Sequence, residues 1–252
     1  MKATQQEHFI AREWLEMVRG KIFFYPAAMY DSAEPILIFW PYVNEFWFCD
    51  KAYPAGLQLK PAVSSSVGFQ VVTSTKDGSV NAIFERRTGQ SGKKFWFLEP
   101  SRLRESYRTD NGDVIKVIRR RGFGQIAITT EFGPKSIGVF MHRGDSLCEG
   151  GSGVSFLANK KSSYEQTSRL FEKLSERLAD RAIIVSDGSN SKIPWVNKYF
   201  DKDIDSIDAY QELAADVYEY GSFLWQVVGW MSKRNARPTL VWGLTRLSLE
   251  GG

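Results

Sequence analysis

The rest of the chain is organised around residues 137–153, IGVFMHRGDSLCEGGSG, in this protein of 252 residues. The apolar run from Ile137 to Met141 predicts a buried strand. A loop rich in glycine and charge follows it, and glycine allows a ligand or another chain to approach the backbone closely. We expect the loop to line a functional pocket; the alternative is a tight structural turn with solvated charges. The pocket would use Arg143, Asp145, Ser146, Glu149, Gly150, Gly151, Ser152 and Gly153.

A second continuous apolar run, residues 182–185, also opens into a polar loop. Such runs are typical of parallel strands that are buried on both faces. Apolar residues at helical spacing from Tyr164 to Leu178 predict a helix between the two strands. Parallel strands joined by a helix point the same way, so both loops should lie at the carboxyl edge of the sheet, where ligands bind. The second loop adds Asp187, Gly188, Ser189 and Asn190 to the predicted site.

Two shorter apolar runs, residues 22–25 and 46–49, predict strands near the start of the chain. In nucleotide-binding βαβ units, the turn after the first strand takes the ligand, and an acid ending the second strand binds ribose hydroxyls. Asp50 stands at the end of the second run, although its distance from the first turn is somewhat longer than usual. The turn itself contains Tyr25, Pro26, Ala27, Ala28 and Asp31.

Residues 63–131 differ from their surroundings, because short apolar runs alternate there with turn signals such as Asp110-Asn111-Gly112-Asp113. We interpret this region as antiparallel strands added to, or inserted into, a parallel sheet. Residues 101–124 hold seven Arg or Lys against three acids, a surplus equal to the chain's whole net charge of +4. An anionic partner such as nucleic acid is expected here through Arg119, Arg120 and Arg121; the alternative is a solvated hairpin.

The remaining patterns in the sequence limit the class of protein and the fold that can be expected. Helices are predicted at residues 4–19 and 207–231, with a final strand at 239–242. No apolar run is long enough to span a membrane, and the first residues lack a signal-peptide core, so a cytoplasmic protein is expected. Cys49 and Cys148 do not form a disulfide framework, and with only two histidines a zinc site is not expected.

The prediction is a single three-layer, Rossmann-like α/β domain over residues 1–252. It has a mostly parallel sheet with helices on both faces, and a β-rich insertion at about residues 63–131.

The block VFMHRGDSLCEGG, residues 139–151, resembles the nucleophile block of GDSL-type esterases and lipases. That resemblance implies that Ser146 attacks an ester carbonyl. The family places the block near the N-terminus, with an Asp and His pair near the C-terminus. Here no histidine follows His142, so no base is available to activate the serine, and this is the less favoured alternative.

The order of elements is similar to that of class I S-adenosylmethionine-dependent methyltransferases: a first turn at residues 25–31, Asp50, a polar loop at residues 142–146, and a C-terminal helix and strand. The resemblance implies that Asp50 holds the ribose of S-adenosylmethionine. Arg143 and Asp145 would lie near the cofactor or acceptor, and Asp187 or Asn190 would orient the acceptor. The family's first turn carries glycines, whereas this turn has none. The alternative is therefore a non-catalytic relative that has kept the fold and binds a partner, such as nucleic acid, through the basic middle region, residues 101–124.

Overall fold

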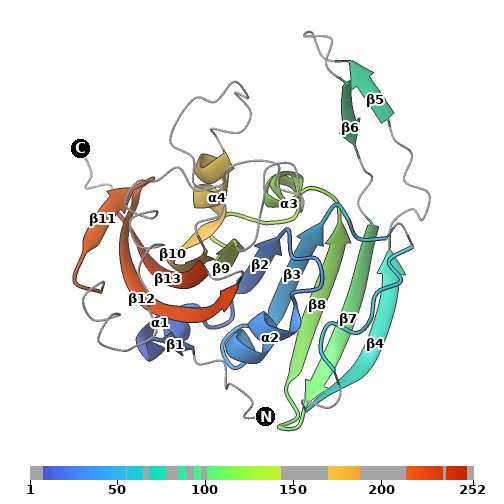
Figure 1. Cartoon of the computed structure of the whole chain (residues 1–252), viewed down its shortest axis with the longest axis horizontal. Coiled ribbons are helices and arrows are strands. Elements are labelled where there is room, and N and C mark those ends of the chain that lie inside the picture. Colours follow the sequence, from blue (N-terminus) through green and yellow to red (C-terminus); the bar gives the residue numbers. More distant parts are fainter. Residues whose placement is uncertain are drawn as a thin grey trace.

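A computed structural model of the protein describes residues 8–54, 56–64, 68–77, 85–88, 94–97, 101–142, 170–187, 214–234 and 237–248. One mixed sheet of eleven strands dominates this part of the chain (Figure 1). A separate hairpin pairs β5 (Glu85–Thr88) with β6 (Lys94–Phe97). Strands far apart in the sequence therefore share one continuous layer.

Five neighbouring strands in the centre of the sheet are parallel. Across the sheet they run β8 (Val114–Arg121), β3 (Glu45–Asp50), β2 (Ile22–Pro26), β9 (Ile137–His142) and β10 (Leu178–Ser186). The strands predicted from the four apolar runs are confirmed as β2, β3, β9 and β10. Because β9 pairs with β10 in parallel, the chain leaves both strands at the same edge, as the sequence predicted.

Antiparallel strands extend this centre on both sides. β7 (Ser101–Thr109) and β4 (Phe69–Asp77) follow β8. Beyond β10 come β13 (Arg237–Arg246), β12 (Phe223–Arg234) and β1 (Phe9–Ile10), and β11 (Val217–Tyr220) also pairs with β12. Of the strands found within residues 63–131, β4, β7 and β8 are thus part of the main sheet, whereas β5 and β6 form the separate hairpin.

The predicted three-layer Rossmann-like fold class is wrong. Most strand pairs of the sheet are antiparallel, and strands far outweigh helices. The described residues contain only four short helices, which are α1 (Arg12–Met17), α2 (Ala33–Phe39), α3 (Gly124–Thr130) and α4 (Leu170–Arg177).

Two individual elements were also predicted wrongly. The long helix expected at residues 207–231 is replaced, in the described residues, by the hairpin of β11 and β12, which turns at Gly221 and Ser222. Residues 126–128 form one of the short apolar runs within residues 63–131 that were expected to be antiparallel strands, but they lie in α3. A β-hairpin could not connect β8 to β9, because these two strands point the same way and such strands need a crossover connection.

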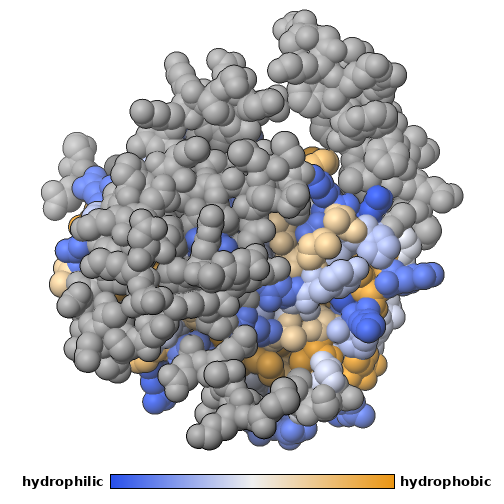
Figure 2. Space-filling model, in the orientation of Figure 1, coloured by the Kyte–Doolittle hydropathy of each residue, from blue (hydrophilic) through white to orange (hydrophobic). Residues whose placement is uncertain are grey.

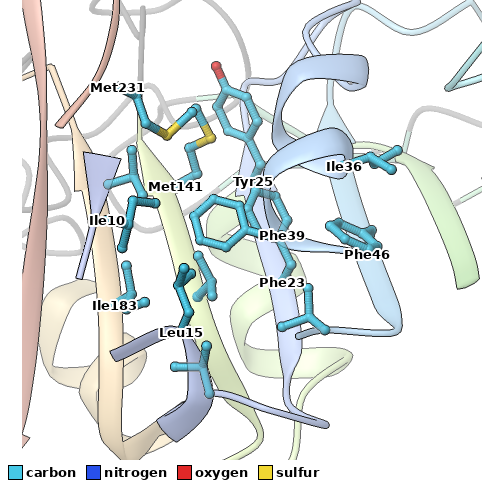
Figure 3. Close-up of a cluster of buried hydrophobic side chains, with 14 of the residues drawn as sticks. Ile10, Leu15, Phe23, Tyr25, Ile36, Phe39, Phe46, Met141, Ile183 and Met231 are labelled. Carbon is cyan, nitrogen blue, oxygen red and sulfur yellow. The ribbon is translucent and has the colours of Figure 1, made fainter. Parts of the chain in front are cut away.

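The core has two parts because the central strands are buried on both faces. Phe23 and Phe24 are adjacent in β2, fully buried, and belong to different clusters. The cluster around Phe23 includes Phe46 of β3 and Phe39 of α2 (Figure 3). The other contains residues of α3 and α4. Burying each such side chain contributes about 1.5 to 3 kcal/mol, so the two clusters anchor the parallel centre.

No helix among the described residues has both the length and the apolar character needed to cross a membrane.

Candidate ligand site at the carboxyl edge of the parallel strands

The order of the parallel strands creates a switch in the direction of the chain between β2 and β9. From β2 the chain continues outward on one side through β3 to β8, and then returns to the other side of β2 to form β9 and β10. The connections that leave β2 and β9 therefore run in opposite directions. In open sheets with parallel strands, ligands bind beside such a switch in direction, outside the carboxyl ends of the strands.

The turn that leaves β2 at this point has an unusual backbone. Ala27 and Met29 have φ angles of 58° and 45°, in the left-handed region. For residues other than glycine, this conformation costs roughly 1 to 2 kcal/mol each. The turn is closed by hydrogen bonds from the backbone N–H of Asp31 to Ala28 O at 2.8 Å and from the N–H of Ala28 to Cys49 O at 3.3 Å. Strained backbone of this kind persists only where the surrounding structure holds it.

Asp50, at the end of β3, is the residue that holds the turn. Its carboxylate is fully buried; Oδ2 accepts the backbone N–H of Met29 at 2.9 Å, and Oδ1 accepts that of Ala52 at 2.7 Å. Its carbonyl oxygen accepts the N–H of Gly122, which follows β8, at 3.0 Å. One residue therefore joins the segments after β2, β3 and β8. This role was missed in the sequence, where only the position of an acid after a strand could be seen.

Two tyrosines complete the described part of the edge. The hydroxyl of Tyr25 donates to Asp31 Oδ2 at 3.0 Å, which ties β2 to the end of its own turn. Tyr53 was not predicted. Its side chain is buried, and its hydroxyl makes no hydrogen bond with the described residues. Burial, reinforced by the nearby charge of Asp50, holds the pKa of Tyr53 well above its ordinary value, so the hydroxyl stays protonated and can donate.

On the other side of this switch point, β9 ends on the buried His142, and β10 is followed by the buried Asp187. The backbone N–H of Asp187 donates to His142 O at 3.3 Å, so the two strand ends are level. The other predicted residues of the two loops lie outside the described residues and stay predictions. They are Arg143, Asp145, Ser146, Glu149, Gly150, Gly151, Ser152, Gly153, Gly188, Ser189 and Asn190.

The predicted nucleic-acid contact of the three consecutive arginines does not hold for Arg119 and Arg120. Arg119 and Arg120 are only 4% and 2% exposed. They point to opposite faces of β8, where Arg119 pairs with Glu105 at 2.7 Å and Arg120 pairs with Glu131 at 3.0 Å. Arg121 donates to the carbonyl oxygen of Tyr53 at 2.8 Å. Arg119 and Arg120 cannot reach a phosphate, so this prediction is wrong for them.

The two ion pairs belong to networks that brace the sheet beside the site. Glu105 also accepts the hydroxyl of Tyr107 at 2.7 Å, and that hydroxyl accepts the N–H of Ala62 at 2.7 Å. On the opposite face, Glu131 binds Arg102 at 2.8 Å as well as Arg120.

The Cys49 thiol lies 3.8 Å from an Arg120 nitrogen. Burial raises the pKa of this thiol to about 12, although Arg120 lowers it in part. Cys49 is therefore a neutral core residue and not a nucleophile.

Neither of two described cavities has residues 25–31 or 50–53 in its lining. One of about 170 Å³ is lined by residues including Leu57, Leu59, Val71 and Glu105, between the segment after β3 and the outer strands. The exposed surface over these strands mixes apolar and hydrophilic residues (Figure 2). A second cavity of about 290 Å³, beside Trp40 and Tyr42, lies near the amino ends of β3 and β8. Within the described ranges, no group of three His, Cys, Asp or Glu residues could hold a metal ion.

Comparison with protein-family models, with curated proteins and with solved structures gave no match for this chain.

Proposed function

We propose that the protein binds S-adenosylmethionine at the carboxyl edge of β2, β3 and β9 and transfers its methyl group to an acceptor. The observation that carries this proposal is the strained turn at Ala27 and Met29, beside the switch in strand direction. Strained backbone at residues other than glycine clusters at ligand clamps and active sites, where it can preorganise the site. The strain lies where a nucleotide-type ligand would bind in a sheet with this strand order.

Asp50 is compatible with ribose binding even though it holds the turn. The N–H groups of Met29 and Ala52 donate to its two oxygens, and a carboxylate oxygen can accept more than one hydrogen bond. A ribose hydroxyl could therefore donate to the same carboxylate. The neighbouring Tyr53 hydroxyl is a buried donor for which a ligand oxygen would be a partner. Methyl transfer depends mainly on alignment of the two reactants, so it needs no nucleophile or metal from the protein.

The acceptor would approach from the side of β9 and β10. We assign the role of orienting it to Asp187, which follows β10 and is buried. Arg143, Asp145 and Asn190 remain the proposed partners from the two loops.

The second candidate is a binding protein without catalysis. Two observations favour it: the first turn contains no glycine, and the N–H of Met29 in this turn is already bonded to Asp50. Such a protein would bind the nucleoside ligand but transfer no methyl group from it.

The test is a set of melting curves with S-adenosylmethionine, S-adenosylhomocysteine, adenosine or ATP. At one hundred times its dissociation constant, a ligand adds about 2.7 kcal/mol to stability. For a domain of this size that corresponds to a rise in Tm of about 5 to 10 °C. No rise with either S-adenosyl compound at millimolar concentration would refute the proposal.

Two matched variants sharpen the test. Tyr53→Phe removes a hydroxyl that has no hydrogen-bond partner among the described residues, so the free protein should be as stable as the wild type, while the ligand-induced rise in Tm becomes smaller. Tyr107→Phe removes a hydroxyl bonded to Glu105 and Ala62, so it should lower the Tm of the free protein and leave the ligand-induced rise unchanged. Transfer of tritium from methyl-labelled S-adenosylmethionine to an acceptor then decides between the two candidate functions, a methyltransferase and a binding protein without catalysis.

A further inference from the structure

The cavity of about 290 Å³ lies at the opposite edge of the parallel strands from the proposed S-adenosylmethionine site. Three connections line it: Arg19 and Gly20 before β2, residues 40–44 before β3, and residues 113–115 at the start of β8. Its volume is close to the lower end of the range for small-molecule sites, which is about 300 to 1,000 Å³. We name it the amino-edge cavity.

Backbone hydrogen bonds join the walls of the amino-edge cavity to one another. The N–H of Gly20 donates to Tyr42 O at 2.9 Å, which ties the connection before β2 to the connection before β3. The N–H of Lys116 donates to Asn44 O at 2.8 Å, which ties β8 to the same segment. The cavity is therefore formed without a ligand, and a preformed site loses less conformational entropy when it binds one.

Aromatic and apolar side chains make up most of the lining. Trp40 and Tyr42 are half-buried, and Val114 is 47% exposed. Trp40 is held by an edge-to-face contact with Phe69, with ring centroids 6.0 Å apart. Such a lining suits the apolar body of a ligand, and the face of an aromatic ring attracts an organic cation.

The one cation in the lining, Arg19, is already engaged. Its guanidinium lies over the ring of Tyr42, 5.2 Å from the ring centroid. It also donates to Pro41 O at 2.8 Å and pairs with Glu16 at 2.8 Å. Arg12, the other partner of Glu16, is 85% exposed and lies farther away, at 3.9 Å. Arg19 is therefore part of the wall, where it holds Tyr42 and Pro41 in place.

Asp113 supplies a negative charge to the same lining. Its backbone is bonded to Thr109, since its N–H donates to Thr109 Oγ1 at 3.1 Å and its carbonyl oxygen accepts the N–H of Thr109 at 2.9 Å. Its carboxylate forms no hydrogen bond or ion pair with any residue in the described ranges, and neither does the side-chain amide of Asn44. These oxygens can accept hydrogen bonds from an ammonium group, which has three N–H donors.

We propose that the amino-edge cavity binds a small organic cation, a primary amine carried on an apolar or aromatic body. The ammonium group donates to Asp113 and Asn44, and the body packs on Trp40 and Val114. An anionic ligand does not fit, because Asp113 repels it and Arg19 is bound to Glu16. The site goes beyond methyl transfer and does not depend on the carboxyl edge.

The test is a titration of the full chain with phenethylamine, followed in proton–nitrogen NMR spectra at low salt. The readout is the indole N–H signal of Trp40, identified by its loss in Trp40→Phe. Phenethylamine should shift this signal and bind in the millimolar range or more tightly. Asp113→Asn keeps the backbone bonds to Thr109 and should weaken binding about fivefold, the upper end for an exposed ion pair.

The matched control is Asp110→Asn, which removes the same charge from an exposed residue of the same turn that does not line the cavity. It should bind like the wild type. Phenethyl alcohol, which has the same body without the charge, should bind more weakly than the amine. The proposal is overturned if the Trp40 signal does not shift, if the alcohol or the anion hydrocinnamate binds as tightly as the amine, or if both Asn variants weaken binding equally.

Discussion

The carboxylate of Asp50 accepts a hydrogen bond from the backbone N–H of Met29 at 2.9 Å, across 21 positions of the chain. Together with its bond from Ala52, this contact fixes the turn at the carboxyl edge. Hydrogen bonds to a buried charged group contribute about 1.5 to 3 kcal/mol each. We therefore expect Asp50→Asn to lower the free energy of unfolding by about 2 to 4 kcal/mol, measured by urea denaturation at pH 7.

Asp180→Asn is the control for this substitution. Asp180 also binds two partners, Lys135 and Arg246, but its side chain is 58% exposed. Surface ion pairs contribute about 0 to 1 kcal/mol, so this variant should lose less than about 1 kcal/mol. Equal losses in the two variants would mean that Asp50 does not hold the turn.

The strain at Met29 predicts an unusual response to glycine. Glycine adopts a φ of 45° without steric cost. The strain energy that the substitution removes offsets the greater conformational entropy of glycine in the unfolded chain. Met29→Gly should leave the stability unchanged or raise it by up to about 1 kcal/mol. Tyr30→Gly, at an exposed neighbour without positive φ, should instead cost about 1 kcal/mol. If both variants lose the same stability in urea, the turn is not strained.

The centre of the fold could be predicted because its signals are local. Residues 137–141 and 182–185 are continuous apolar runs, and only strands covered on both faces favour such runs. The hairpin of β11 and β12 was missed because its apolar residues fit two periods. Phe223, Trp225 and Val227 alternate as in a strand, but with Leu224 and Val228 they also recur at helical spacing. The turn at Gly221 and Ser222 was the signal that decides between the two.

The site could be predicted only in part, because its contacts join distant segments. The acid after β3 was visible in the sequence, but its bond to Met29 was not. Arg119 and Arg120 looked like a solvated basic run because their partners, Glu105 and Glu131, are 14 and 11 residues away. Nothing local in the sequence indicates that such charges are buried.

The cluster of Glu131, Arg102 and Arg120 predicts a pH dependence of stability. Burial opposes the ionisation of Glu131, but hydrogen bonds from Arg102 and Arg120 outweigh it and hold its pKa below the ordinary 4.5. A carboxyl whose pKa is lowered in the folded state adds stability above its unfolded pKa and loses it as the pH falls through the folded value. Glu131→Gln should therefore cost about 3 kcal/mol at pH 7. The difference from the wild type should shrink below about pH 4.5; a difference that stays constant down to pH 3 would contradict this explanation.

Cys49 should be inert in the folded protein. Its thiol is buried, and its pKa of about 12 leaves very little thiolate at pH 8. In a Cys148→Ser background, labelling of Cys49 by a disulfide reagent at pH 8 should be at least about 1,000-fold slower than in guanidinium. Rapid labelling of the folded protein would show that Cys49 is accessible and is not buried beside Arg120.

The most direct test of the central claim is amide hydrogen exchange with and without S-adenosylhomocysteine. If the ligand lies on the strained turn, exchange should slow at residues 25–31 and 50–53, by up to about 100-fold at one hundred times the dissociation constant. The turn at Gly221 and Ser222 serves as the internal control and should not change. Protection confined to other parts of the chain, or a ligand that binds without slowing exchange at Met29 and Ala52, would contradict the proposed site.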